Sequence, residues 1–122
     1  MSILSEFKNG LIMFIDELID QFPSEADLVI IRIFLNDQVP IVDVINHVIV
    51  NLLPFKNQIK NRDEKVLIDS DILFEKLSKS KVNYFKKLWR SNSLDDDDRI
   101  IIWKWIDSFI YLASKYQAIL KQ

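Results

Sequence analysis

The sequence of 122 residues contains no cysteine, one glycine, three prolines and one histidine. The absence of cysteine excludes disulfide scaffolds, zinc–thiolate sites, iron–sulfur clusters and thiol nucleophiles, and it fits a reducing compartment. A single glycine excludes the glycine-rich loops that bind phosphate groups. No uninterrupted apolar run exceeds five residues, as at 11–15, whereas a membrane-spanning helix needs roughly 18. Because a basic leader and a small-residue cleavage site are also missing, we expect an intracellular protein without a membrane anchor.

The composition is that of a folded globular protein, with 49% hydrophobic and 28% charged residues. A chain of this length is expected to form one domain over residues 1–122. Residues 1–54 carry 2 basic and 8 acidic groups, for a net charge of −6, whereas residues 55–90 carry 10 and 5, for a net charge of +5. The uneven charge either gives the domain an acidic and a basic side or places an anion-binding function in the middle third.

Apolar residues recur at helical spacing over almost the whole chain. The clearest stripes predict helices over residues 4–22 and 41–52, the second ending near Pro54. Gly10 lies inside the first of these helices, where glycine costs roughly 1 kcal/mol relative to alanine. We therefore predict a close contact between Gly10 and another helix.

A further helix is predicted over residues 24–35, with Ser24 and Asp27 as a capping box. Its segment 28–35 is apolar on nearly every side, so it is either a central buried helix or a buried strand. No credible partner strand exists elsewhere in the sequence, which favours the helix.

The second half of the chain is predicted to contain shorter elements and one long helix. Residues 55–67 indicate a short helical turn followed by the longest loop, and short helices are expected over 72–77 and 82–89. A capping pattern at 93–96 precedes a helix that reaches nearly to Leu120. The prediction is an all-α fold, a compact single-domain bundle of five to six helices with a long C-terminal helix and one core.

Catalytic and metal-binding patterns are not found in the sequence. His47 lies one turn after Asp43, and we expect a surface pair because no nucleophile can be placed beside them. The acidic run at 95–98 complements the positive end of a helix dipole, and successive helical side chains point about 100° apart instead of converging on one ion. We therefore predict that the protein is not an enzyme and binds no cofactor or metal, although a carboxylate site between distant helices stays open.

The C-terminal helix is apolar on most of its circumference. Trp103 lies roughly 160° from Trp105 around the helix, so both cannot be central to one stripe. Such a helix is either surrounded by its own domain or presents one strip to another chain. Because Trp and Tyr are enriched at interfaces, we predict that the smaller strip, Ile100, Trp103 and Tyr111, is a protein interface. The main stripe, predicted to be buried, comprises Ile102, Trp105, Ile106, Phe109, Leu112, Ala113, Tyr116 and Leu120.

Residues 76–90 form a basic segment with interleaved aromatic residues, a composition that suggests nucleic-acid binding. Helical spacing places Phe85 and Trp89 on the core side, which leaves a small basic patch capable of weak phosphate contacts. The candidate nucleic-acid residues are Lys79, Lys86, Lys87 and Arg90.

The last third of the chain carries an aromatic pattern in which Leu-Trp is followed about a dozen residues later by Ile-Trp-Lys-aromatic. The residues are Phe85, Lys86, Lys87, Leu88, Trp89, Leu94, Ile102, Trp103, Lys104, Trp105 and Ile106. This pattern resembles small, mostly uncharacterised helical proteins of large eukaryotic DNA viruses. The resemblance covers about a third of the chain and implies a viral origin, with the host cytoplasm or the virion as the location, but no activity.

Two function hypotheses follow from these observations. The first is a non-enzymatic protein-interaction or structural protein that acts through a helical surface and has a protein partner or self-associates. The alternative is a nucleic-acid-binding accessory factor that uses the basic segment 76–90.

Overall fold

The computed structural model describes residues 2–68, 86–87, 89–90 and 94–121. The helices of these ranges are α1 (Ile3–Gln21), α2 (Ala26–Asp37), α3 (Ile41–Asn51), the 3₁₀ helix η1 (Leu53–Phe55), α4 (Lys56–Lys60), α5 (Lys65–Ile68) and α7 (Asp96–Leu120). No strand occurs in the described ranges, so the predicted all-α class and long C-terminal helix are confirmed there. The predicted count of five to six helices is not matched, because only α1, α2, α3 and α7 of the described helices exceed two turns. The short helices predicted over 72–77 and 82–89 lie largely outside the described residues.

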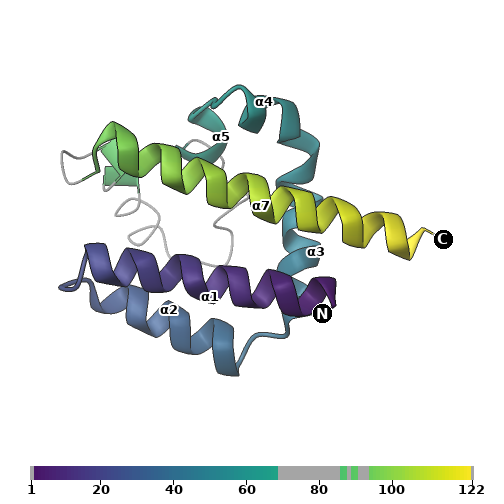
Figure 1. The fold of residues 1–122 in the computed structure, drawn as a ribbon, viewed down its shortest axis with the longest axis horizontal. Helices are drawn as coiled ribbons and strands as arrows, with labels where there is room; N and C mark the ends of the chain where they lie inside the picture. Colours follow the sequence, from purple (N-terminus) through teal and green to yellow (C-terminus); the bar gives the residue numbers. More distant parts are fainter. Residues whose placement is uncertain (1, 69–85, 88, 91–93, 122) are drawn as a thin grey trace.

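Helix α1 packs against α2 on one side and against α7 on the other (Figure 1). Helix α3 contacts both α1 and α7, near the C-terminal half of α7, and α4 lies on the side of α7 away from α1. Helix α7 is therefore covered from two sides. None of the described helices is both long and apolar enough to cross a membrane.

The packing of α1 against α7 depends on the single glycine. Ser2 begins α1 by accepting a hydrogen bond at its Oγ from the Ser5 backbone N–H, at 3.1 Å. Further along α1, a Cβ atom at Gly10 would lie 3.4 Å from the Phe109 ring and 3.8 Å from the Trp105 ring. The predicted close contact of Gly10 with another helix is confirmed, and that helix is α7.

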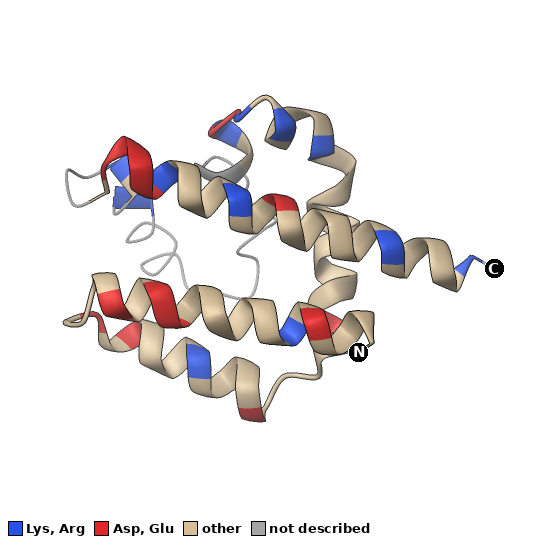
Figure 2. Cartoon of the chain, viewed as in Figure 1, with Lys and Arg blue, Asp and Glu red and all other residues tan. Residues whose placement is uncertain are grey.

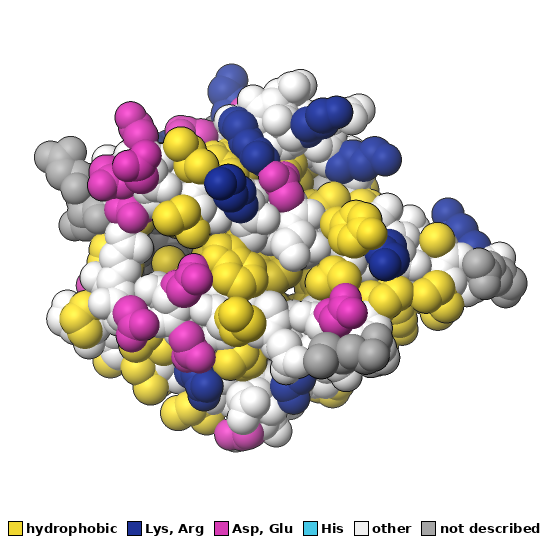
Figure 3. All heavy atoms as spheres, in the orientation of Figure 1, with side chains coloured by type: hydrophobic (Ala, Val, Ile, Leu, Met, Phe, Trp, Pro, Cys, Tyr) yellow, Lys and Arg dark blue, Asp and Glu magenta, His cyan; other side chains and the backbone are white. Residues whose placement is uncertain are grey.

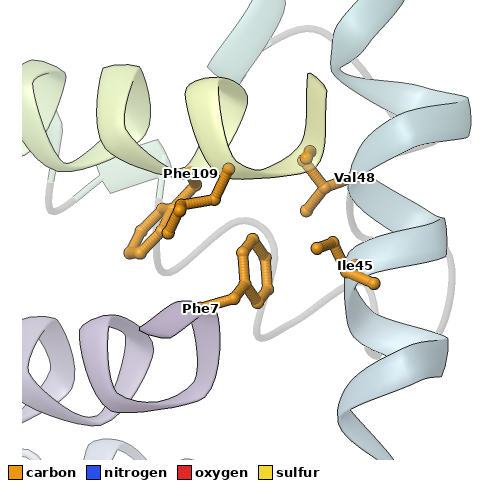
Figure 4. Packing of buried hydrophobic residues seen from close by; sticks show 6 residues of the cluster. Phe7, Ile45, Val48 and Phe109 are labelled. Atoms are coloured by element: carbon orange, nitrogen blue, oxygen red, sulfur yellow. The ribbon is translucent and has the colours of Figure 1, made fainter. Parts of the chain in front are cut away.

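The first of two buried clusters lies where α1, α3 and α7 meet. Phe7 and Phe109 pack with ring centroids 5.6 Å apart, and Ile45 and Val48 point toward them from α3 (Figure 4). The stripes predicted for α1 and α3 supply half of the buried residues of this cluster, because both helices turn one apolar side inward. Its buried residues are Phe7, Ile45, Val48, Phe109, Leu112 and Ala113.

The second buried cluster lies between α4, α5 and the N-terminal half of α7. Its buried residues are Ile59, Val66, Trp89, Leu94 and Trp103. Trp89 and Trp103 meet edge to face, with ring centroids 5.9 Å apart. Leu52 and Ile110 pack against both clusters. The predicted single core is therefore divided into two clusters, because α7 buries opposite sides along its length.

A tight turn joins α4 to α5, where the sequence predicts the longest loop. Arg62 adopts a left-handed backbone conformation at this turn, with φ of 58°. Its Nη1 donates a hydrogen bond to the Ile59 carbonyl at 3.2 Å, and its guanidinium lies 5.4 Å from the centre of the Trp103 ring. The turn thus closes the outer side of the second cluster.

The segment predicted as either a central helix or a strand is the helix α2. Its N-cap residue is Glu25 and makes no side-chain cap hydrogen bond, so the predicted capping box of Ser24 and Asp27 is wrong. Leu28 is the one buried residue of α2. The prediction that α2 is central is also wrong, because α2 packs on the outside of α1.

Helix α7 begins two positions after the place that the predicted capping pattern of Ser93 and Asp96 would give it. Asp95 and Asp98 form the capping box, with the Asp98 backbone N–H donating to Asp95 Oδ1 at 2.8 Å and the Asp95 backbone N–H donating to Asp98 Oδ2 at 3.1 Å. The predicted capping role of the acidic run is confirmed, with Asp95 in place of Ser93 as the cap. At the other end, Leu120 is 60% exposed, so its predicted burial is wrong.

Candidate protein-interaction surface

The solvent-facing side of α2 is formed by large apolar side chains. The exposed fractions are 43% for Val29, 48% for Ile30, 49% for Ile33 and 52% for Phe34. We call these four residues the outer face of α2. Leu28 is 4% exposed and points the opposite way, toward α1. Exposed apolar patches that form one continuous surface mark interaction sites, whereas single exposed apolar residues do not.

The sequence of α2 explains why this face is unpaired. A helix that is apolar all round needs neighbours on every side. Helix α1 covers the side that carries Leu28, and no other described helix makes comparable contact with α2. The segment 28–35 therefore has more apolar surface than the described helices cover.

Polar bonds fix α2 on α1, and one of them pairs Arg32 with a carboxylate. Arg32 donates from Nε to Asp16 Oδ1 at 2.5 Å, and this hydrogen bond raises the pKa of the Arg32 guanidinium. Lys8 Nζ donates to the Asn36 carbonyl at 3.0 Å. Arg32 is thus held as a cation against a carboxylate, and it gives α2 a fixed orientation.

Acidic residues dominate the edges of α2. Glu25 and Asp27 lie at its N-terminal end and Asp37 at its C-terminal end. Figure 2 shows mainly acidic bands on α1 and α2, and basic bands on α4. The outer face is therefore an apolar surface with an acidic margin.

The interface predicted on α7 is partly wrong. Trp103 is 5% exposed and belongs to the second cluster, because the N-terminal half of α7 turns this side toward α4 and α5. Ile100 and Tyr111 are 51% and 61% exposed, as predicted. Asp107 lies between them along the helix and accepts hydrogen bonds from Arg62 Nη1 and Nη2 at 2.8 and 2.7 Å. Without Trp103, the predicted strip is interrupted by charged groups.

The basic candidate residues are only partly described. Lys79 lies outside the described residues, Lys86 is half-buried, and Lys87 and Arg90 are exposed. Trp89 is buried, as predicted. Figure 3 shows that basic side chains also gather over α4 and the adjoining part of α7. The exposed lysines of α4 are Lys56 and Lys60, and Lys104 is the exposed lysine in the N-terminal half of α7.

The remaining polar candidate, His47, has a polar neighbour on its own helix. His47 Nδ1 lies 3.1 Å from Asn51 Nδ2, so Asn51 is a neighbour that the sequence reasoning missed. Asn51 follows His47 by one helical turn, the same spacing that suggested Asp43 on the other side. No group of three or more His, Cys, Asp or Glu residues within the described part of the chain could hold a metal ion.

One small cavity lies between α1 and α7. It has a volume of about 180 Å³, an apolar lining that includes Phe14, Leu18 and Ile102, and the carboxylates of Glu17 and Asp98. Glu17 Oε2 accepts a hydrogen bond from Trp105 Nε1 at 2.8 Å. Because Asp98 also belongs to the capping box, both carboxylates already have structural hydrogen bonds.

Comparison of the chain with protein-family models, curated proteins and solved structures found no match. Among the described surfaces, the outer face of α2 brings four exposed large apolar side chains together within two helical turns. The exposed large apolar side chains of α7 are spread along its whole length, at Ile100, Ile101, Tyr111, Ile119 and Leu120. It is the candidate site that we carry forward.

Proposed function

We propose that the protein is a non-enzymatic protein-interaction or structural protein that acts through the outer face of α2. The observation that carries this proposal is the exposure of Val29, Ile30, Ile33 and Phe34 on one side of a helix that is otherwise packed and ion-paired. An apolar surface of this kind costs solubility unless another molecule covers it. The resemblance of segment 85–106 to viral proteins supports a viral origin and a setting in the host cytoplasm or the virion.

The proposal is tested by capture from cells with three tagged forms of the full chain. These are the wild type, Ile33→Glu on the outer face, and Val50→Glu on α3 as the matched control. Ile33 and Val50 are both exposed aliphatic residues, at 49% and 68%, so each substitution adds the same charge to a surface position. Circular dichroism and thermal unfolding establish that all three forms are folded alike.

We expect quantitative mass spectrometry to find proteins that co-purify with the wild type and Val50→Glu but are lost with Ile33→Glu. Copies of the chain itself, distinguished by a second tag, count among these proteins. If the three forms capture the same proteins in the same amounts, the outer face of α2 is not the interaction surface and the proposal is wrong.

A second candidate function is nucleic-acid binding through the basic segment. The exposure of Lys87 and Arg90 supports it, since both side chains could reach phosphate groups. With three or four phosphates engaged, binding to duplex DNA should weaken with salt at a log–log slope near −3, and the dissociation constant should be about 10⁻⁴ to 10⁻⁶ M. Replacing Lys86, Lys87 and Arg90 by Gln should abolish binding in a fluorescence-anisotropy titration. Tight binding with base preference would place this function first.

A further inference from the structure

The outer side of α2 has the residue spacing of a helix-pairing seam. Ala26, Ile30, Ile33 and Asp37 follow one another at intervals of four, three and four residues. This alternation keeps one line of side chains on the same side of a helix and is the pattern by which two helices pack along their length. The line lies opposite Leu28, the residue that α2 buries against α1. A second helix could therefore lie along α2 without disturbing the α1 contact.

The seam is complementary to itself when two copies run antiparallel. If a two-fold axis passes between residues 31 and 32, Ile30 of one copy lies opposite Ile33 of the other. Val29 and Phe34 lie on the two flanks of the seam, where each approaches the same residue of the other copy. The contact between Ile30 and Ile33 then occurs twice, as a two-fold interface requires. Every large exposed side chain of α2 finds an apolar counterpart in this register, and none is left over.

The two ends of α2 also favour the antiparallel direction. In the same register, Ala26 lies opposite Asp37. The N-terminus of α2 has no side-chain cap, so its first backbone N–H groups lack a side-chain acceptor. Asp37 uses Oδ1 to accept from Asn36 Nδ2 at 2.8 Å, and its second oxygen can approach the partner N-terminus, where a carboxylate is favourable. A parallel pair would instead bring the two Asp37 carboxylates together.

The area of the outer face sets the strength of such a pair. Its four side chains are each about half exposed and together leave on the order of 300 to 400 Å² per copy. A stable interface covers about 800 Å² per partner, so α2 alone supports a weak and reversible dimer. We expect a dissociation constant of about 10 to 100 µM, at the weak end of specific association.

The acidic margin of α2 distinguishes a second copy of the chain from other binding partners, because each partner gives a different charge interaction with it. Glu25, Asp27 and Asp37 would repel an anionic membrane surface. In a homodimer the like charges of two acidic margins oppose association, and added salt screens them, so salt should strengthen a dimer held by apolar contacts. A basic helix from another protein would show the opposite dependence, because salt weakens attraction between unlike charges.

From these observations we infer that the outer face of α2 is a homodimer interface, in which α2 pairs antiparallel with α2 of a second copy of this chain. The inference rests on the proposed function, since it names the partner of the same surface. It adds a defined register, with position 30 opposite 33 and position 26 opposite 37.

The first experiment measures self-association of the purified full chain by sedimentation velocity from 5 to about 500 µM, in low and high salt. We expect a reversible dimer whose dissociation constant falls as salt rises from about 50 to 500 mM. Ile33→Glu should raise the dissociation constant at least tenfold, because a two-fold interface contains the substituted position twice and therefore gains two negative charges. Val50→Glu should change it less than twofold. A wild type that stays monomeric, or a dimer that Ile33→Glu leaves intact, would overturn the inference.

A result that overturns the homodimer does not by itself overturn the proposed function. A monomeric wild type that still loses a captured protein with Ile33→Glu would show that the outer face binds a different partner, so the proposed function would stand and the homodimer would not. A dimer that weakens with salt would point to contacts between acidic and basic regions and would also overturn the inference.

The second experiment tests the register by disulfide trapping, which the absence of native cysteine makes clean. Ala26→Cys and Asp37→Cys chains are oxidised separately and as a mixture. Antiparallel pairing predicts a disulfide only in the mixture, joining position 26 of one chain to position 37 of the other, because like positions lie about 16 Å apart along the helices. Disulfides that form in the separate samples and not between 26 and 37 would show parallel pairing and overturn the proposed register.

Discussion

Replacing Trp103 by Ala should destabilise the protein strongly, although its place in the sequence suggests a surface residue. The side chain is 5% exposed and packs against the other buried residues of the second cluster. Truncation removes the edge-to-face contact with Trp89 at 5.9 Å between ring centroids, and the contact of the Arg62 guanidinium at 5.4 Å. It also leaves a cavity between α7 and the short helices α4 and α5.

The magnitude follows from the kind of contacts that are lost. Truncating a buried Phe or Trp to Ala costs about 3 to 5 kcal/mol, including the cavity. The Arg62 contribution is small, about 0.5 kcal/mol, because the Arg62 side chain is 42% exposed and screened by water. Since a domain of this size has about 5 to 15 kcal/mol of stability in total, Trp103→Ala should remove at least about a fifth of it.

The measurement is urea unfolding followed by far-UV circular dichroism, because fluorescence would change with the removed tryptophan itself. The matched control is Tyr111→Ala, on the same helix but 61% exposed, which should change the free energy of unfolding by less than about 0.5 kcal/mol. If Trp103→Ala costs less than about 1 kcal/mol, or no more than Tyr111→Ala, then Trp103 is not a core residue and the division into two clusters is wrong.

Three further substitutions test separate contacts by urea unfolding. Gly10→Ala should stabilise the protein by about 0.5 to 1 kcal/mol, because a Cβ atom fits at 3.4 Å from Phe109. Gly10→Leu should destabilise the protein by about 1 to 3 kcal/mol, because the larger side chain overlaps with α7. Equal effects of the two changes would contradict the close packing of α1 on α7. Asp95→Ala should cost about 0.5 to 2 kcal/mol by removing the α7 cap, and a neutral result would show that the cap is dispensable. Asp107→Asn should cost less than about 1 kcal/mol, because the ion pair with Arg62 is nearly half exposed, and a larger loss would show that Arg62 supports the second cluster.

The sequence was sufficient to predict those helices that bury one side only. In α1 and α3, a single apolar stripe faces a polar side, and both Phe7 and Ile45 are fully buried as their spacing predicts. The contact of Gly10 with a neighbouring helix was also predictable, because glycine within a helix has a cost that packing must offset.

The sequence was insufficient wherever a helix is apolar on more than one side. A helical wheel gives the angle between Trp103 and Trp105 but not which neighbour covers each side. In α7 both sides are covered by the chain itself, and in α2 one side is covered and the other is exposed. The same pattern thus produced two opposite outcomes, because burial depends on the positions of α1 and α4 relative to each helix.

The order of the helices along the chain has a consequence for synthesis. Glu17 and Trp105 are hydrogen-bonded but 88 residues apart in sequence, and α7 completes both buried clusters. At a translation rate of about 5 to 20 residues per second, the 88 residues from Glu17 to Trp105 take about 4 to 18 s to synthesise. The sides of α1 and α3 that α7 covers stay exposed until α7 is made. During that interval the nascent chain exposes these surfaces together with the outer face of α2. The emerging first half is therefore the form of this protein that exposes the most apolar surface to chaperones. Helix α7 then covers the inner sides of α1 and α3, while the outer face of α2 stays exposed.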